Sequence, residues 1–182
     1  QLARIQNDLF DLGADLSTPD ERAGALGDGV RAITYDPHLR AWREIEPWER
    51  QNLSAGAPSA QRGARWPLSA RLRSIARRYL GAGALSLPEN SGILVPEVFS
   101  PGVARALGTL FTQGRGPRVA VFHDAIPLRL PELTPPKTVA RFPSYLVELL
   151  AFDGIAAVSD DSRAALVDYW RWLEVANPPP VR

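Results

Sequence analysis

The chain has 182 residues, of which 45% are hydrophobic and 23% are charged, and this length and composition predict one globular domain with its own core. The formal net charge is +1, so the whole chain has no field that would attract nucleic acid or an anionic membrane. Cysteine is absent, which excludes disulfides, a cysteine nucleophile and zinc sites with cysteine ligands.

The first residue is Gln1 and the chain contains no methionine, so we interpret it as a fragment of a longer protein. It has no apolar run of transmembrane length and no signal-peptide pattern, and we therefore expect a cytoplasmic location. Lys137 is the only lysine among 21 basic residues, a usage that favours a GC-rich bacterial genome.

Residues 1–28 differ from the rest of the chain and predict a short helical extension. Its apolar positions at helical spacing are Ile5, Leu9, Leu12 and Leu16. The run RIQNDLFDLGADLSTPDE, from Arg4 to Glu21, resembles a segment of the PduO-type cobalamin adenosyltransferases, helical bundles that transfer adenosyl from ATP to cob(I)alamin. The phosphate-binding loop and the arginine-rich helix of that family are not found here. An adenosyltransferase fragment therefore stands as an alternative that rests on this run alone.

The next segment predicts a strand, a helix and a loop. Residues 30–35 alternate like a strand, which ends at Asp36 before a proline. The polar run RAWREIEPWERQNL, residues 40–53, predicts a helix. Residues 54–65 are rich in Ala, Gly, Ser and Pro and predict an exposed loop.

Two residue types in this segment invite a functional interpretation. Trp42, Trp48 and Trp66 stand among arginines, a pattern that suits either stacking on nucleic-acid bases or packing, and the near-neutral charge favours packing. His38 has no acidic neighbour at a convincing metal-ligand spacing, so we interpret it as structural or exposed.

A second helix is predicted from Pro67 to Leu80, with apolar and basic residues on different faces. The apolar residues are Leu68, Leu72, Ile75, Ala76 and Tyr79, and the basic residues are Arg71, Arg73, Arg77 and Arg78. The basic face could contact anionic lipid or an acceptor phosphate, and the alternative is an ordinary solvated helix face.

Three short apolar runs in the second half predict buried parallel strands, residues 93–95, 118–122 and 155–158. Helices are predicted over residues 103–110 and 137–150, with Pro143 either kinking the second helix or lying in its first turn. A further helix follows the last strand, with Ser159 as its N-cap and acidic residues in its first turn. The pattern is that of a βαβα module.

From about Val30 to Arg182 the chain resembles the amino-terminal domain of GT-B glycosyltransferases of the family 4 type. The resemblance is carried by VFHDAIPLRLPELTPP, by RFPSYLVELL in the next helix and by DGIAAVSDDSRAALVDYW. It implies an α/β fold with a Rossmann-like three-layer parallel sheet, preceded here by the extra amino-terminal helix. It also implies an acceptor-side domain over residues 29–176 and the start of an interdomain linker at 177–182, where three prolines occur.

The resemblance implies a sugar transfer from a nucleotide-sugar donor, used as a co-substrate, to a carbohydrate or lipid-linked acceptor. In that family the nucleotide-sugar is held by a second domain, so we expect this chain to be nearly inactive alone. No metal or cofactor is expected, because helix N-termini and positive groups of the second domain stabilise the leaving diphosphate. A non-catalytic Rossmann-like binding domain remains a further alternative.

Polar residues end each of the three predicted parallel strands, where ligands bind in open α/β sheets. His123 could donate a hydrogen bond to a sugar hydroxyl, and the resemblance implies that it faces the donor sugar. Asp124 could act as a base, although a carboxylate in this position often accepts backbone N–H groups of its own turn. Glu97 and the Ser159-Asp160 pair are candidate substrate-binding residues, with Ser159 also serving as an N-cap.

Overall fold

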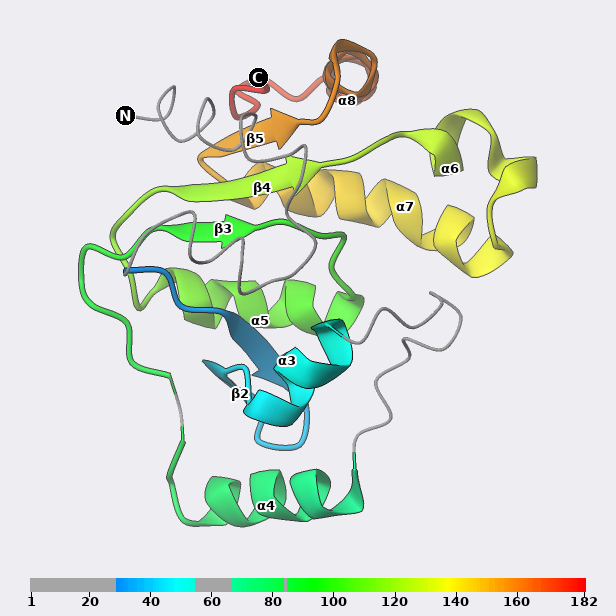
Figure 1. The fold of residues 1–182 in the computed structure, drawn as a ribbon. Coiled ribbons are helices and arrows are strands. Elements are labelled where there is room, and N and C mark those ends of the chain that lie inside the picture. The colour runs from blue at the N-terminus through cyan, green and yellow to red at the C-terminus, as the bar shows by residue number, and fades with distance from the viewer. Residues whose placement is uncertain (1–28, 55–66, 84) are drawn as a thin grey trace. The chain divides into compact units, whose positions relative to one another are not determined.

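The computed structural model describes residues 29–54, 67–83 and 85–182, and it contains both helices and strands (Figure 1). The chain divides into two compact units, residues 1–86 and 87–182. The single domain expected over residues 29–176 spans both units. The helix predicted within residues 1–28, the adenosyltransferase-like run and nearly all of the loop predicted at 54–65 lie outside the described residues.

The first unit contains a β-hairpin. Strand β1 (Ile33–Asp36) pairs antiparallel with β2 (Ala41–Glu44), in a register that joins Ile33 to Glu44. Arg40 closes the connection in the left-handed region, with φ 59°, and its N–H donates to the Asp36 carbonyl at 2.7 Å. Trp42 is buried and packs edge-on against Tyr35, so this tryptophan serves packing, as expected.

The helix predicted over residues 40–53 is wrong for its first half. Residues 41–44 form β2, and helix α3 (Pro47–Ser54) begins only afterwards. Pro47 has no N–H and would break the interior of a longer helix, whereas the first helical position accepts it. Pairing with β1 and the burial of Trp42 and Arg43 then decide in favour of a strand.

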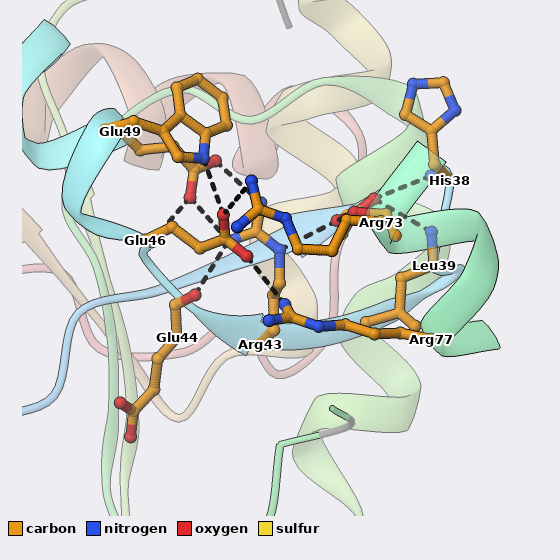
Figure 2. Close-up of polar contacts among 11 residues, drawn as sticks. His38, Leu39, Arg43, Glu44, Glu46, Glu49, Arg73 and Arg77 are labelled. Carbon is orange, nitrogen blue, oxygen red and sulfur yellow. Dashed lines mark hydrogen bonds and ion pairs between the residues drawn. The ribbon is translucent and has the colours of Figure 1, made fainter. Parts of the chain in front are cut away.

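A buried polar network joins the hairpin to the helices of the first unit (Figure 2). Asp36 is fully buried and accepts hydrogen bonds from Arg43 Nε at 2.9 Å and from Ser74 Oγ at 2.7 Å. The Arg43 guanidinium also binds both carboxylate oxygens of Glu49, at 2.6 and 2.9 Å. A buried charge is tolerated only when it is paired and hydrogen-bonded, so these contacts fix the positions of their elements.

Helix α4 (Leu68–Tyr79) is turned opposite to the amphipathic expectation. Its buried residues are Ala70 and Ser74, while Leu68 and Leu72 are exposed. On the same inner side Arg77 Nη1 donates to Glu46 Oε1 at 2.7 Å. The polar network therefore determines which face of α4 packs inward.

The second unit is built on a three-stranded parallel sheet in the order β3-β4-β5, and Figure 1 shows its arrows pointing the same way. The strands are β3 (Ile93–Val95), β4 (Arg118–Phe122) and β5 (Gly154–Ala157), which confirms the predicted parallel strands to within about a residue. In the register Leu94 pairs with Val119, and Ala120 pairs with Ile155.

Helices connect the strands of this unit. Helix α5 (Pro101–Phe111) joins β3 to β4, and α6 (Ile126–Arg129) and α7 (Pro136–Glu148) join β4 to β5. Short 3₁₀ turns, η2 (Pro131–Leu133) and η3 (Leu149–Ala151), precede and follow α7. Helix α8 (Asp160–Trp172) follows β5. Pro143 lies inside α7 rather than in its first turn.

Apolar and aromatic side chains form the core of this unit. Phe99 packs edge-on against Tyr145 and Phe111 against Phe152, with ring centroids 5.1 and 5.2 Å apart. Trp170 of α8 is 1% exposed, and its indole N–H donates to the Leu146 carbonyl of α7 at 2.9 Å. This core holds the helices against one another without any buried ion pair like that of Asp36 and Arg43 among the residues described for this unit.

The predicted linker, residues 177–182, returns to the sheet. Val181 forms a parallel bridge with Ile155, and Arg182 N–H donates to the Ile155 carbonyl at 2.9 Å. Within the described part of the chain, no helix has both the length and the apolar character needed to cross a bilayer.

Candidate functional site

The carboxyl ends of the three parallel strands are tied together by hydrogen bonds. His123, after β4, contacts the Pro96 carbonyl, after β3, through Nε2 at 2.7 Å. The His123 carbonyl in turn accepts from Ser162 Oγ of α8 at 2.7 Å. The sheet edge where ligands bind in open α/β folds is therefore a connected structure, with His123 at its centre.

The contact with Pro96 determines the proton position on a neutral His123 ring. A carbonyl oxygen only accepts hydrogen bonds, so Nε2 must carry the proton, and Nδ1 is then a hydrogen-bond acceptor. Nδ1 has no hydrogen-bond partner among the described residues, and the side chain is half-buried. His123 thus has one nitrogen fixed by the fold and one available to a ligand.

Asp124 has the local role that its position predicts. One of its carboxylate oxygens, Oδ1, accepts the Ile126 N–H at 2.9 Å, in the turn that starts α6. The residue is exposed, as is Glu97 after β3. Asp124 can therefore accept a further hydrogen bond from a bound molecule without leaving its turn.

Tyr145, on α7, is a buried residue on which the charges of these two carboxylates act. Burial, together with the negative charges of Asp124 and Glu97, raises the pKa of Tyr145 from 10.0 to about 12. The residue is 1% exposed, and its hydroxyl has no hydrogen-bond partner among the described residues. We call Glu97, His123, Asp124 and Tyr145 the strand-end cluster.

The third strand end contributes structure to this edge. Ser159 is the N-cap of α8, as predicted, and its Oγ accepts the Ser162 N–H at 3.1 Å. Asp160 is exposed and pairs with Arg163 at 3.4 Å, while Asp161 pairs with Arg129 of α6 at 2.7 Å. These contacts account for Ser159 and Asp160 locally, and neither side chain has a hydrogen bond or ion pair with the strand-end cluster in the described part of the chain.

The sequence pattern does not indicate Tyr145 or Ser162 as parts of this edge. Tyr145 is three residues after Phe142 and four before Leu149, so it reads as one more member of the buried face of α7. A hydroxyl on an otherwise apolar face was the available signal. Ser162 gave no signal, because its bond to the His123 carbonyl joins residues 39 positions apart.

His38 lies in the connection between β1 and β2, and within the described ranges it belongs to no group of side chains placed to hold a metal ion. The His38 N–H donates to Asp36 Oδ1 at 2.9 Å, which gives this residue a structural position in the hairpin connection. Among the described residues, no group of three or more His, Asp or Glu side chains is placed to hold a metal ion.

Comparison of the chain with protein-family models, with curated proteins and with solved structures gives no match.

Proposed function

We propose that the strand-end cluster is the acceptor-side half of a glycosyltransferase site, carried on a Rossmann-like domain of the GT-B type. The acceptor, a carbohydrate or a lipid-linked sugar, binds with its hydroxyl groups toward Glu97 and Asp124, and His123 faces the donor sugar, as the resemblance implies. The nucleotide-sugar is held by a second domain, as in the enzymes that the chain resembles. The free Nδ1 of His123, at the sheet edge where Glu97 follows β3 and Asp124 follows β4, is the observation that carries this proposal.

The chemistry of these groups suits a polyhydroxylated molecule. Carboxylates and a neutral imidazole nitrogen accept hydrogen bonds from hydroxyl groups, and a sugar presents several such donors. In the transfer the acceptor oxygen bonds to the anomeric carbon, the bond from that carbon to the diphosphate breaks, and the hydroxyl proton must go to a base. Asp124 and His123 are positioned at the sheet edge where such a proton could be accepted.

Binding tests the acceptor role directly. We expect simple sugars and sugar alcohols to shift amide NMR signals around Glu97, His123 and Asp124 in the 182-residue chain, and Asp124→Asn to weaken this binding. Asp168→Asn is the matched control, because Asp168 is an exposed carboxylate of α8 paired with Arg171. Signals that respond to no sugar, or to nucleotide-sugars instead, would contradict the acceptor assignment.

Turnover tests the catalytic role. We expect no sugar transfer by the 182-residue chain with common nucleotide-sugars, and clear transfer by the purified chain would contradict the assignment of half a site. In a polypeptide that joins this chain to a nucleotide-sugar-binding domain, His123→Ala should lower kcat/KM by about a hundredfold or more. An unchanged kcat/KM would remove His123 from the mechanism.

A non-catalytic Rossmann-like binding domain is the second candidate, and one observation favours it. His123 and Asp124 both have local structural partners, the Pro96 carbonyl and the Ile126 N–H. Sugar binding that persists without any transfer in the joined polypeptide would support this candidate. The adenosyltransferase alternative is supported only by the run from Arg4 to Glu21. The parallel sheet of the second unit does not fit a helical bundle.

A further inference from the structure

Helix α4 presents an apolar stripe to solvent. Leu68, Leu72 and Tyr79 are 71%, 59% and 82% exposed, and Ile75 is 38% exposed. Their spacing of four, three and four residues places all of them on one face of a helix. Single exposed leucines are common on protein surfaces, but a continuous stripe of this kind marks an interaction surface.

The polar network holds this stripe outward. Ser74 donates to the buried Asp36, and Arg77 donates to Glu46, both from the inner face of α4. Rolling the helix over to bury its leucines would break both contacts and leave Asp36 with fewer donors. An unsatisfied buried charge costs more than an exposed leucine stripe, so the outward orientation is built into the fold.

The charge of α4 is of one sign. The helix contains four arginines and no acidic residue, although the whole chain has a net charge of only +1. Arg73 and Arg77 contact Glu46, at 3.7 and 2.7 Å. Arg71 and Arg78 are exposed beside the stripe, and neither pairs with an acidic residue in the described ranges.

We propose that this outer face of α4, the stripe together with Arg71 and Arg78, docks on an anionic lipid surface. The stripe enters the boundary between headgroups and acyl chains, and the two arginines meet the lipid phosphates. Tyr79 suits this depth, because its ring is apolar and its hydroxyl can stay in the headgroup layer. At 12 residues, about 18 Å, α4 lies along the surface rather than across the bilayer.

Charge favours lipid over a second copy of the chain. Two α4 helices packed stripe to stripe would bring their arginines together without an intervening acid from either helix. An anionic bilayer instead supplies apolar depth and negative charge together, and each arginine near such a surface strengthens binding about fivefold. The docking does not depend on the sugar chemistry proposed for the other unit.

Vesicle co-sedimentation of the 182-residue chain tests the proposal. We expect binding to vesicles of phosphatidylglycerol mixed with phosphatidylcholine, little binding to phosphatidylcholine alone, and weaker binding at about 1 M salt, where charges are screened beyond about 3 Å. Absence of binding to the anionic vesicles, or equal binding to both kinds, would overturn it.

Matched variants locate the surface. Leu72→Ser together with Tyr79→Ser should reduce binding at least tenfold, because each removes exposed apolar area from the stripe. Arg71→Gln together with Arg78→Gln leaves the stripe intact and should remove the preference for anionic vesicles. Leu133→Ser, at an equally exposed leucine of the other unit, and Arg171→Gln are the controls that should bind like the unaltered chain.

Two outcomes would contradict the proposed occupant. Variants of α4 that bind like the controls would place the lipid contact elsewhere. A dimer detected by sedimentation without vesicles, and dissociated by Leu72→Ser with Tyr79→Ser, would make a second copy the occupant of the stripe. Circular dichroism should be unchanged by these surface substitutions, which separates loss of docking from loss of folding.

Discussion

The two units solve the problem of a stable interior in different ways. The first unit places a charged carboxylate, Asp36, at the centre of its contacts and surrounds it with hydrogen-bond donors. The second unit relies on packed aromatic and aliphatic side chains, and one of its buried polar atoms, the Tyr145 hydroxyl, stays without a partner among the described residues. A directional polar network fixes orientation even when that exposes leucines, whereas an apolar core tolerates an unpaired hydroxyl more easily than an unpaired charge.

Removing the central arginine should cause the largest loss of stability, and the loss should fall on the first unit. Arg43→Ala leaves Asp36 and Glu49 without their guanidinium, and we expect a loss of about 3–5 kcal/mol in the stability of the first unit. Arg31→Ala breaks an exposed pair with Glu44 and should cost about 1 kcal/mol or less. Hydrogen exchange of hairpin and sheet amides measures the two units separately. Equal effects of the two substitutions would refute the central role of the network.

Alkaline pH should weaken the second unit selectively. The pKa of Tyr145 rises from 10.0 to about 12 on folding, so its stabilising contribution is complete below pH 10 and is lost as the pH rises toward 12. Two pKa units correspond to about 3 kcal/mol. Tyr145→Phe should abolish this dependence and leave stability at neutral pH equal or slightly higher, because it removes an unpartnered buried hydroxyl. Denaturant unfolding at several pH values checks both results.

Replacing Gly116 by alanine should destabilise the second unit, whereas the same replacement at Gly108 should not. The Cβ of Gly116→Ala would lie 2.5 Å from Gly92 N and 2.6 Å from the Ser91 carbonyl carbon, so the loops before β3 and β4 must separate, at a cost of about 1–3 kcal/mol. Gly108→Ala on α5 meets nothing within 4 Å and should stabilise the helix by up to about 1 kcal/mol. Thermal unfolding of both variants provides the comparison, and effects of the same sign would contradict it.

Acid should weaken the first unit, with a smaller effect than the loss of Arg43. Burial acts to raise the pKa of Asp36, but hydrogen bonds led by that from Arg43 outweigh it and hold the pKa below its ordinary value of 3.8. A lowered folded-state pKa gives stability above the unfolded value that is lost as the pH falls through the folded one. Hairpin amides should therefore lose protection below about pH 4, and Asp36→Asn should remove much of that dependence.

Local patterns in the sequence determined most of the second unit. The strands over 93–95 and 118–122 are short β-branched runs, and the N-cap Ser159 is a local hydrogen bond, so neighbouring residues were enough to place them. The parallel direction followed from the helices between strands. The same reasoning placed His123 and Asp124 at one sheet edge, because parallel strands end on the same side.

Contacts between residues far apart in the sequence determined the features that local patterns did not predict. Residues 41–44 became a strand because Arg43 reaches Asp36 across the hairpin. Helix α4 turned its leucines outward because Ser74 bonds to Asp36, 38 positions away. Tyr145 is buried by the packing of α7, and there the charges of Glu97 and Asp124 act on its hydroxyl. Periodicity reports which residues share a face, but the partners of buried polar groups determine which face turns inward.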